Sequence, residues 1–221
     1  MSLTNNCLLR VNLGCGTTPT PGWRNFDNSF TVRLARVSRL LEMLPCLGVI
    51  EQYLEFARVV RQHGIRWADT TRRIPLPDSS AEVVYSSHMI EHLDPQQEVP
   101  RFLTEAHRIL VPGGVLRLAV PDLRKRAAAY LETQDADAFV ASLLMANGTP
   151  HGILAVARRV LVGFRDHKWM YDARSLVRCL ERHGFRAARQ VPPGETTIQN
   201  PGPLNLRERE GESVYVEARR G

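Results

Sequence analysis

Two glycines and one aspartate of this sequence have the types and spacing to bind a nucleoside-like ligand. Gly14 and Gly16 flank Cys15 directly after a β-rich run at residues 8–13. Glycine lets the backbone turn sharply and approach a ligand closely, because it has no Cβ. Asp27 ends the next short β-rich run, where a carboxylate can accept hydrogen bonds from ribose hydroxyls. These residues predict a ligand site at the carboxyl ends of neighbouring strands.

The glycine run also indicates which ligands this site would accept. Dinucleotide-binding turns follow G-x-G-x-x-G and hold a pyrophosphate at the start of a helix. Here Pro19 occupies the position of the third glycine. Asp27 follows Gly14 by 13 residues, whereas a dinucleotide fold places its acidic residue about 20 residues on. A pyrophosphate ligand is therefore disfavoured, and a nucleoside without phosphate fits the pattern.

Residues 88–92, His-Met-Ile-Glu-His, match the H-x-x-E-H pattern of a zinc-peptidase helix. Histidines four residues apart share one helix face, and the glutamate between them could act as a general base. However, Asp94 and Pro95 end such a helix almost at once, and the segment begins directly after a predicted strand. A zinc peptidase is therefore kept as a remote alternative, and the sequence predicts no metal ligands.

The basic charge of the chain does not favour a nucleic-acid partner. The 221 residues include 29 Lys and Arg against 23 Asp and Glu, which gives a net charge of +6. Nucleic-acid binders concentrate such charge and interleave it with aromatic residues. Here arginines are spread from Arg10 to Arg220 without a long run, and only 7% of residues are aromatic. Most of these arginines are expected to be solvated.

Cysteine usage and hydropathy predict a cytoplasmic protein. Cys7, Cys15, Cys46 and Cys179 form no C-x-x-C pair, which argues against a zinc site or a disulfide framework. No stretch reaches 18 uninterrupted apolar residues, so no membrane span is expected. The first residues lack the basic flank and apolar run of a secretory signal.

Periodicity predicts a single α/β domain, residues 1–221, with a largely parallel sheet. The predicted strands cover residues 8–13, 23–27, 65–69, 81–86, 115–120 and 213–218. The predicted helices cover two runs between 32 and 63, then 99–110, 122–146 and 172–183. Residues 192–205 contain Pro-Pro-Gly and Pro-Gly-Pro and are expected to form a loop.

Residues 30–66 are predicted to be a helical insertion. Leu34, Val37, Leu41 and Leu44 repeat at helical spacing and need a partner to bury against. Two helices here would form a lid beside the ligand entrance or a surface through which the chain forms homo-oligomers.

Six segments of this sequence, taken in order, resemble the class I S-adenosylmethionine-dependent methyltransferases of the methyltransferase type 11-like group. They are VNLGCG (11–16), PGWRNFD (21–27), IPLPDSSAEVVYSSHMIEHL (74–93), FLTEAHRILVPGGVLRLAVPDL (102–123), HKWMYDARSLVRCLERHGF (167–185) and SVYVEA (213–218). The resemblance implies a Rossmann-like fold with seven strands, six of them parallel and the last antiparallel. It also implies S-adenosyl-L-methionine as cofactor and S-adenosyl-L-homocysteine as product.

The same resemblance implies a set of cofactor-binding residues. They are Asn12, Gly14, Cys15, Gly16, Thr17, Asp27, Asp69, Thr70, Ser86 and Ser87. Asp27 would bind the ribose hydroxyls, and Asp69 with Thr70 would face the adenine amino group. Ser86, Ser87 and His88 would border the sulfonium. Asn12 departs from the family pattern, because an acidic residue usually stands there.

The predicted reaction is methyl transfer to a small-molecule acceptor, with sugars and secondary metabolites as the classes considered. The enzyme would mainly align the acceptor with the sulfonium methyl group. If the acceptor must lose a proton, His88 or His167 is the predicted base. The main alternative is a methyltransferase-like module that binds the cofactor or a partner without turnover.

Overall fold

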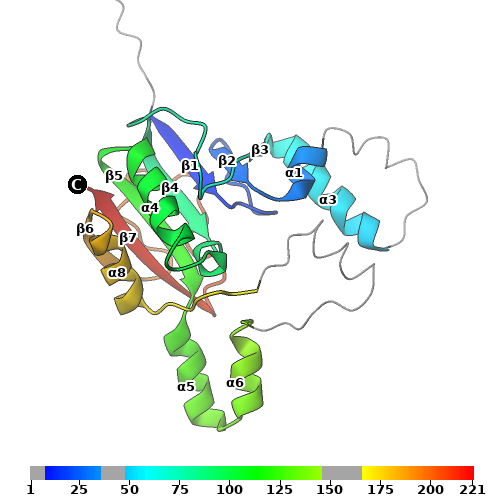
Figure 1. Ribbon diagram of the computed structural model, residues 1–221, viewed down its shortest axis with the longest axis vertical. Helices are drawn as coiled ribbons and strands as arrows, with labels where there is room; N and C mark the ends of the chain where they lie inside the picture. The colour runs from blue at the N-terminus through cyan, green and yellow to red at the C-terminus, as the bar shows by residue number, and fades with distance from the viewer. Residues whose placement is uncertain (1–7, 36–47, 146–165) are drawn as a thin grey trace, which may run out of the picture.

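The molecule is built on a seven-stranded sheet with the strand order β3-β2-β1-β4-β5-β7-β6 (Figure 1). The computed structural model describes residues 8–35, 48–145 and 166–221. The strands are β1 (Leu9–Leu13), β2 (Arg24–Asp27), β3 (Arg66–Trp67), β4 (Ala81–Ser87), β5 (Leu110–Pro121), β6 (Phe185–Val191) and β7 (Ser213–Arg220). β1 to β5 pair in parallel, and β7 runs antiparallel to both of its neighbours. The predicted Rossmann-like fold with a reversed last strand is confirmed.

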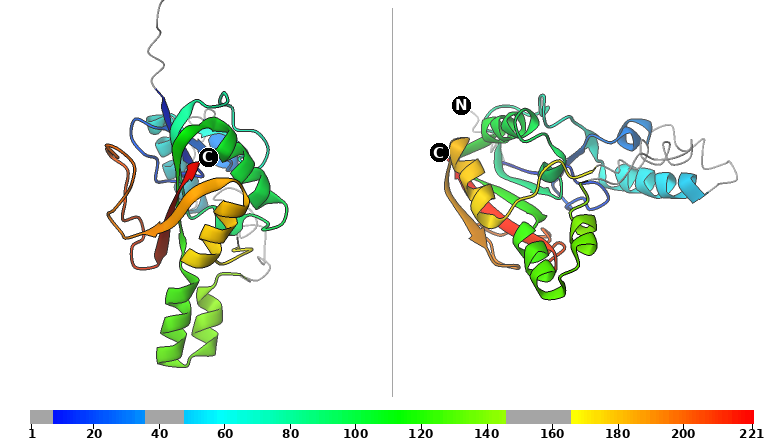
Figure 2. Two further views of the ribbon diagram at one scale, coloured as in Figure 1. Left: turned by 90° about the vertical axis from the view of Figure 1, so that its left-hand side faces the viewer. Right: turned by 60° about the horizontal axis from the view of Figure 1, so that its bottom comes forward.

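Two helices cover one face of the sheet. The helices are α1 (Phe30–Leu34), α3 (Gly48–His63), α4 (Glu98–Ile109), α5 (Leu123–Thr133), α6 (Ala136–Ser142) and α8 (Ala173–Arg182), with one 3-10 turn, η1 (Ile90–His92). α4 buries Phe102 and Leu103 and α8 buries Leu176 and Leu180, all in one apolar cluster with the strands. Figure 2 (left) shows both helices on the same side of the sheet.

The opposite face is covered by a loop rather than by a helix. A parallel crossover is usually built from a dozen or more residues and a helix. Here only residues 14–23 connect β1 to β2, and they contain no helix. Residues 192–212, between β6 and β7, take that place and lie across the sheet from α4 and α8 (Figure 2, left). Ile198 and Leu204 pack there with Trp23.

A buried ion pair fixes this covering segment to the sheet. Arg117 of β5 and Glu217 of β7 face each other in the strand register, and Arg117 Nη1 lies 2.6 Å from Glu217 Oε1. Arg117 also donates to the carbonyls of Glu195 and Leu206. Glu217 accepts from both the amide and the hydroxyl of Thr197. These bonds outweigh the effect of burial and lower the pKa of Glu217.

The helical insertion lies beside the β3 edge of the sheet (Figure 1). Val32 packs with Phe56, Ala57 and Val60 of α3 in an apolar cluster that also contains Cys15. The predicted stripe continues at residues 37, 41 and 44, which lie outside the described residues.

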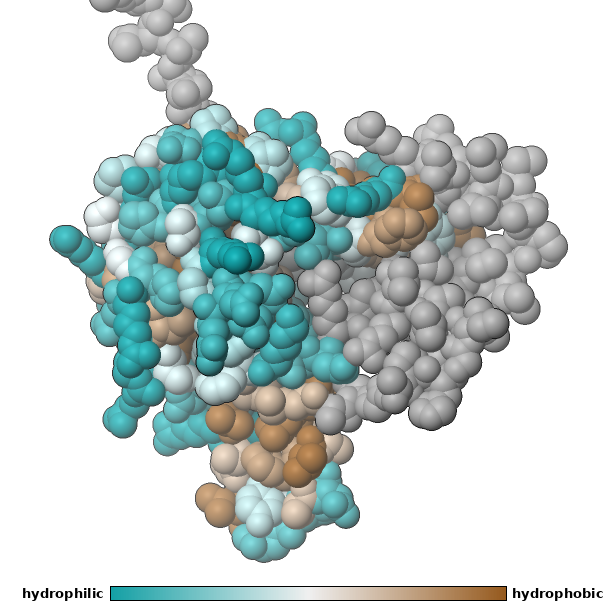
Figure 3. All heavy atoms as spheres, in the orientation of Figure 1, coloured by the Kyte–Doolittle hydropathy of each residue, from teal (hydrophilic) through white to brown (hydrophobic). Residues whose placement is uncertain are grey.

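α5 and α6 form a hairpin that projects from the carboxyl end of β5 (Figure 1). Neither helix buries a residue, and Leu131 and Val140 are exposed. Figure 3 shows the resulting apolar surface on the hairpin. Among the residues that the structure describes, no helix has the length and apolar character needed to cross a membrane.

The turn after β1 requires glycine at its first position. Gly14 has φ +69°, and a Cβ added there would lie 2.5 Å from Met89 Cγ. The backbone amides of Gly14 and Cys15 both donate to the carbonyl of Phe26. The turn is therefore held against β2 on one side and against the end of β4 on the other.

We expect Arg117→Met to lower the free energy of unfolding by about 3–5 kcal/mol, because it leaves the buried Glu217 carboxylate without its partner. Chemical denaturation measures the change. Arg219→Met is the control, since Arg219 is an exposed arginine of the same strand pair, and it should cost only about 0.5 kcal/mol. Equal effects of the two variants would contradict the role of the buried pair.

We expect Gly14→Ala to destabilise the protein by more than Gly22→Ala. Both glycines have positive φ, +69° and +76°, but only at Gly14 would a new Cβ meet another atom within 4 Å. Gly22→Ala should therefore cost only the strain of a left-handed alanine, about 1–2 kcal/mol. In a Met89→Ala background the cost of Gly14→Ala should fall, and denaturation of the four variants measures this coupling. An unchanged cost would exclude the steric contact.

Candidate functional site

Asp27 joins the glycine turn to the end of β2. Asp27 Oδ2 accepts from the Gly16 amide at 3.0 Å, and Oδ1 accepts from the Ser29 amide at 2.7 Å. Each oxygen of a carboxylate can accept a further hydrogen bond. Asp27 is 9% exposed. No atom lies within 4 Å of a Cβ added at Gly16. The turn therefore offers an open backbone beside an acidic acceptor, as a ribose would require.

This turn lies where the strand order changes direction. β1 is followed on one side by β2 and β3 and on the other side by β4 and β5. In open parallel sheets, ligands bind outside the carboxyl ends of the strands at this point. The close approach of Gly14 to Met89 shows that the ends of β1 and β4 meet here.

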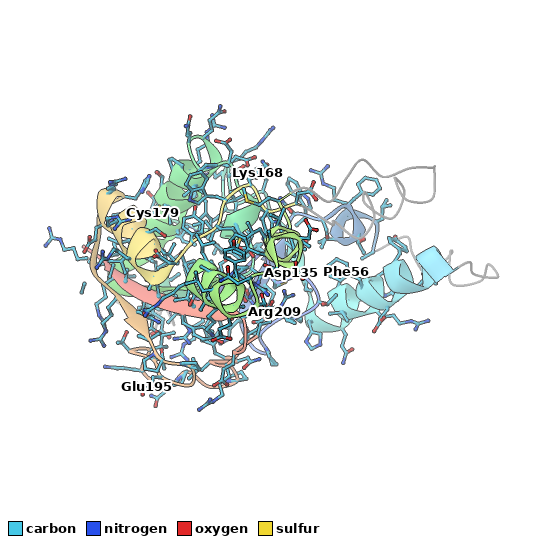
Figure 4. All side chains as sticks on the ribbon, turned by 90° about the horizontal axis from the view of Figure 1, so that it is seen from below. Phe56, Asp135, Lys168, Cys179, Glu195 and Arg209 are labelled. Carbon is cyan, nitrogen blue, oxygen red and sulfur yellow. The ribbon has the colours of Figure 1, made fainter. Side chains whose placement is uncertain are left out.

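A cavity of about 930 Å³ lies at the same end of the sheet. It is lined by Asn28, Asp69, Thr71, His92, Leu93, Asp94, Pro95, Glu98, Met145, Asp166, His167, Lys168 and Trp169. Figure 4 views the molecule from below, with Lys168 labelled on the segment before α8 and Arg209 on the segment before β7. Most of the lining comes from the loops after β2, β3 and β4 and from the segment before α8, with Glu98 from α4 and Met145 from the residues after α6.

Asn12 and Ser86, two of the predicted cofactor residues, form hydrogen bonds with other groups of the protein. Asn12 is buried, and its amide group donates to Thr20 Oγ1 and to the carbonyl of Thr18. Ser86 is buried and donates from its hydroxyl to the carbonyl of Leu13. Both side chains therefore form hydrogen bonds with β1 or with the connection that follows it.

At the end of β3 the cavity is lined by Asp69 of the predicted pair and by Thr71, which follows Thr70. Asp69 lines the cavity, and its Oδ1 accepts from both the amide and the hydroxyl of Thr71. Thr70 is buried, whereas Thr71 lines the cavity. The sequence offered no signal that would distinguish these two threonines.

The remaining predicted residues lie in or near the turn. Thr17 is exposed. Ser87 ends β4 and is buried. Cys15 is buried in the cluster with α1 and α3, and burial raises the pKa of its thiol. A buried neutral thiol is a packing group rather than a nucleophile.

His88 is held away from the cavity lining. Its backbone has φ +48°, a left-handed conformation that is uncommon for residues other than glycine. Its Nε2 lies 2.8 Å from Ser213 Oγ, and its Nδ1 lies 3.4 Å from Arg209 Nη1. Burial, followed by the charge of Arg209, lowers the pKa of His88 to about 3. The ring is therefore neutral near pH 7 and binds protons only weakly.

His167 does line the cavity. Its Nδ1 lies 2.8 Å from the carbonyl of Leu143, so Nδ1 carries the proton and the lone pair is on Nε2. Burial lowers the pKa of His167 below its usual range. The ring of His92 packs edge to face against it, with centroids 5.0 Å apart. Glu91 lies beside both rings, and burial raises the pKa of its carboxyl group to about 8.

The helix required by the zinc-peptidase alternative is absent. Only Ile90–His92 is helical, as a single 3-10 turn, and His88 precedes it in the left-handed conformation. The two histidines of the pattern therefore do not share one α-helical face. Asp94 accepts from the amides of Gln96 and Gln97 near the start of the next helix, α4, which explains why no longer helix forms here.

The sequence reasoning missed several lining residues. Asn28 directly follows Asp27, and Trp169 is 48% exposed beside His167. Four carboxylates, Asp69, Asp94, Glu98 and Asp166, line the cavity with a single lysine, Lys168, among the described residues. Asp69 pairs with Arg72 and Glu98 pairs with Lys168, but carboxylates still outnumber basic groups in this lining, which favours cationic groups.

Comparison with known proteins agrees with this architecture. Residues 47–118 match the family model of a methyltransferase domain. A protein of Mycolicibacterium smegmatis (strain ATCC 700084 / mc(2)155), named as a probable S-adenosylmethionine-dependent methyltransferase, is 37% identical over 67 residues. These residues are 30% of this chain and 23% of that relative, so this chain aligns with less than a quarter of that relative's length.

A solved structure of low sequence identity shares the fold, and a second is similar to it. One is in the complex between the Haloferax volcanii Trm112 methyltransferase activator and a methyltransferase. It has a TM-score of 0.50 at 14% identity and covers 96% of this chain and 81% of that chain. An S-adenosylmethionine-dependent methyltransferase from Mesorhizobium loti has a TM-score of 0.46 at 19% identity, covering 96% and 91%.

The strand order, the glycine turn at the change of direction and the matched segment agree with one another. Residues 47–118 match the methyltransferase-domain family model, and the sheet around them has the Rossmann-like strand order with a reversed last strand that the resemblance to class I S-adenosylmethionine-dependent methyltransferases implies.

Proposed function

We propose that the protein transfers a methyl group from S-adenosyl-L-methionine to a small-molecule acceptor. The observation that carries the proposal is the bond between Asp27 and the Gly16 amide at the carboxyl ends of β1 and β2. It joins an open glycine backbone to an acidic acceptor at the point where the strand order changes direction. A nucleoside cofactor without phosphate needs both features.

The residues of this end fit such a cofactor. Asp27 would bind the ribose hydroxyls, and Asp69 with Thr71 lies at the end of β3 where the base would extend. The acidic lining suits a cationic sulfonium group. When bound, the cofactor supplies an activated methyl group, so the protein has to align an acceptor and exclude competing water.

The cavity supports a small acceptor. Its volume of about 930 Å³ lies in the range of about 300–1,000 Å³ that is typical of small-molecule sites. Trp169 offers an exposed aromatic face at its rim, on which a ring or a sugar could pack. Residues 30–66 would then act as the lid or the self-association surface that the sequence predicted, since α1 and α3 pack beside the turn through Cys15.

His88 and His167, the two predicted bases, differ in how well each could accept a proton from the acceptor. His88 is bound on both ring nitrogens, and its low pKa makes it a poor acceptor of protons. His167 lines the cavity and has its lone pair on Nε2. His167 is therefore the histidine that we propose to act on the acceptor, whether it receives a proton or binds a cation.

Asp27→Ala should weaken binding of S-adenosyl-L-homocysteine by about 1.5–3 kcal/mol, or roughly 10- to 150-fold in Kd, because a charge-assisted bond is lost. Calorimetry measures the affinity, and denaturation of the same variant confirms that the fold persists. Asp137→Ala, on the outward hairpin, is the control and should bind as the wild type does. Equal affinity in the Asp27 and Asp137 variants would remove Asp27 from the site.

His167→Gln should reduce methyl transfer by about 100-fold or more, the range expected when a group acting on the acceptor is lost. His88→Gln should stay within about tenfold of the wild type. Release of S-adenosyl-L-homocysteine, at saturating labelled cofactor across carbohydrate and secondary-metabolite acceptors, measures both rates. The reverse order would assign the role to His88. Cofactor binding without turnover on any acceptor would favour the non-catalytic module instead.

A further inference from the structure

Glu91, His92 and His167 bring three metal-ligating side chains together at the cavity. One carboxylate oxygen and one ring nitrogen from each histidine lie within 4.8 Å of one another. Glu91 and His92 belong to η1, and His167 belongs to the segment before α8. Two imidazoles and one carboxylate form a donor set that binds divalent first-row ions in proteins.

The carboxylate of Glu91 lacks the partners that a buried acid requires. Its side chain is 1% exposed, and neither oxygen has a hydrogen-bond partner among the described residues. A buried charge is normally paired or bound to a metal ion. The nearest ring nitrogen, His88 Nδ1, lies 3.5 Å from Glu91 Oε1 and also faces Arg209 Nη1. A bound cation would satisfy the group.

Both histidines are oriented as metal ligands are. His167 Nδ1 lies 2.8 Å from the carbonyl of Leu143, and His92 Nδ1 lies 3.2 Å from the carbonyl of Asp166. A carbonyl only accepts, so each ring has its proton on Nδ1 and its lone pair on Nε2. Metal-ligating histidines usually donate their other ring N–H to such a backbone oxygen, which fixes the tautomer. His92 Nε2 lies 4.0 Å from Glu91 Oε1.

The backbone joins the two segments that carry these ligands. The amides of Lys168 and Trp169 both donate to the carbonyl of Glu91, at 2.8 and 3.2 Å. The segment before α8 is therefore fixed directly against η1. Bringing the three donor atoms to the usual 2.0–2.2 Å from one ion requires side-chain shifts of about 1 Å.

We propose that Glu91, His92 and His167 bind a divalent first-row transition-metal ion such as Zn²⁺ or Mn²⁺. Three protein ligands at a cavity wall leave at least one coordination position open, which is typical of catalytic rather than structural sites. Asp94, Glu98 and Asp166 line the same cavity and would attract the ion. His88 Nδ1 lies 3.5 Å from Glu91 Oε1, but it also lies 3.4 Å from Arg209 Nη1, whose positive charge would oppose a cation at that nitrogen, so His88 is left out of the ligand set.

The role of the ion rests on the proposed methyltransferase function. With a metal ion at this site, the acceptor of the methyl group is a hydroxyl compound. A metal-bound hydroxyl is a stronger acid than a free one. Its proton would pass to water in the open cavity, and its oxygen would form a bond to the methyl carbon. The bond from carbon to sulfur breaks, and its electron pair stays on sulfur. The ion is unchanged, and His167 acts as a ligand instead of a base.

Calorimetric titration of the chelator-treated full chain with Zn²⁺, without cofactor or acceptor, tests the site directly. We expect one Zn²⁺ per chain. Glu91→Gln, His92→Ala and His167→Ala should each lose more affinity than the 10- to 100-fold that is typical of a lost second-shell group. His107→Ala and His183→Ala, two histidines on other elements, are the controls and should bind as the wild type does.

Two further measurements keep the proposal separate from folding and from methyl transfer. Co²⁺ bound to the wild-type chain should give visible absorption bands that disappear in His92→Ala and His167→Ala, even if Glu91→Gln does not fold. Glu91→Gln should still bind S-adenosyl-L-homocysteine. A wild-type chain that binds no ion, or ligand variants that bind as tightly as the controls, would overturn the metal site while the cofactor proposal stands. A wild-type chain that binds the ion but does not bind S-adenosyl-L-homocysteine would overturn the cofactor proposal while the metal site stands.

Discussion

The buried pair between Arg117 and Glu217 is the constraint on which the arrangement of this protein depends. The connection at residues 14–23 is too short to place a helix on that face of the sheet, so the face needs another cover. A loop rich in proline and glycine buries little apolar area and needs polar anchors instead. Arg117 supplies them through the carbonyls of Glu195 and Leu206, while Glu217 holds the two threonines that follow. The two charges are paired and hydrogen-bonded, which offsets part of the desolvation cost of burying them.

The same segment also reaches the candidate site. Glu208 accepts from the hydroxyls of Tyr85 and Thr18, which connects the covering loop to β4 and to the glycine turn. Arg209 and Ser213, further along, bind the two ring nitrogens of His88. A substitution of Arg117 in β5 would therefore also disturb the contacts of His88 after β4. Because the connection between β1 and β2 contains no helix, Asp27 also follows the glycine turn closely in the sequence.

Hydrophobic runs allowed most of the sheet to be predicted, because β4, β5 and β7 are buried on both faces and are nearly continuous in apolar residues. β6 carried no such signal. Only its ends, Phe185 and Val191, are buried, and arginines occupy much of the rest. It is an edge strand formed by pairing with β7, a contact that no local pattern encodes. At the site, the glycine turn and Asp27 were predictable from local chemistry. Thr71 was not, since its exposure to the cavity depends on how the loop after β3 turns.

The H-x-x-E-H pattern drew attention to the right segment for a wrong structural reason. As an α-helix it would have paired His88 with His92 and left Glu91 between them. The left-handed backbone at His88 and the short 3-10 turn separate the first histidine and direct it toward β7 instead. The histidine that joins Glu91 and His92 at the cavity is His167, more than 70 residues further along the chain. Sequence spacing cannot reveal such a pairing, because it is created by the hydrogen bonds that hold the segment before α8 against Glu91. A buried carboxylate without donors beside two oriented imidazoles is costly for a merely structural core, and a cation bound there would explain why the fold tolerates it.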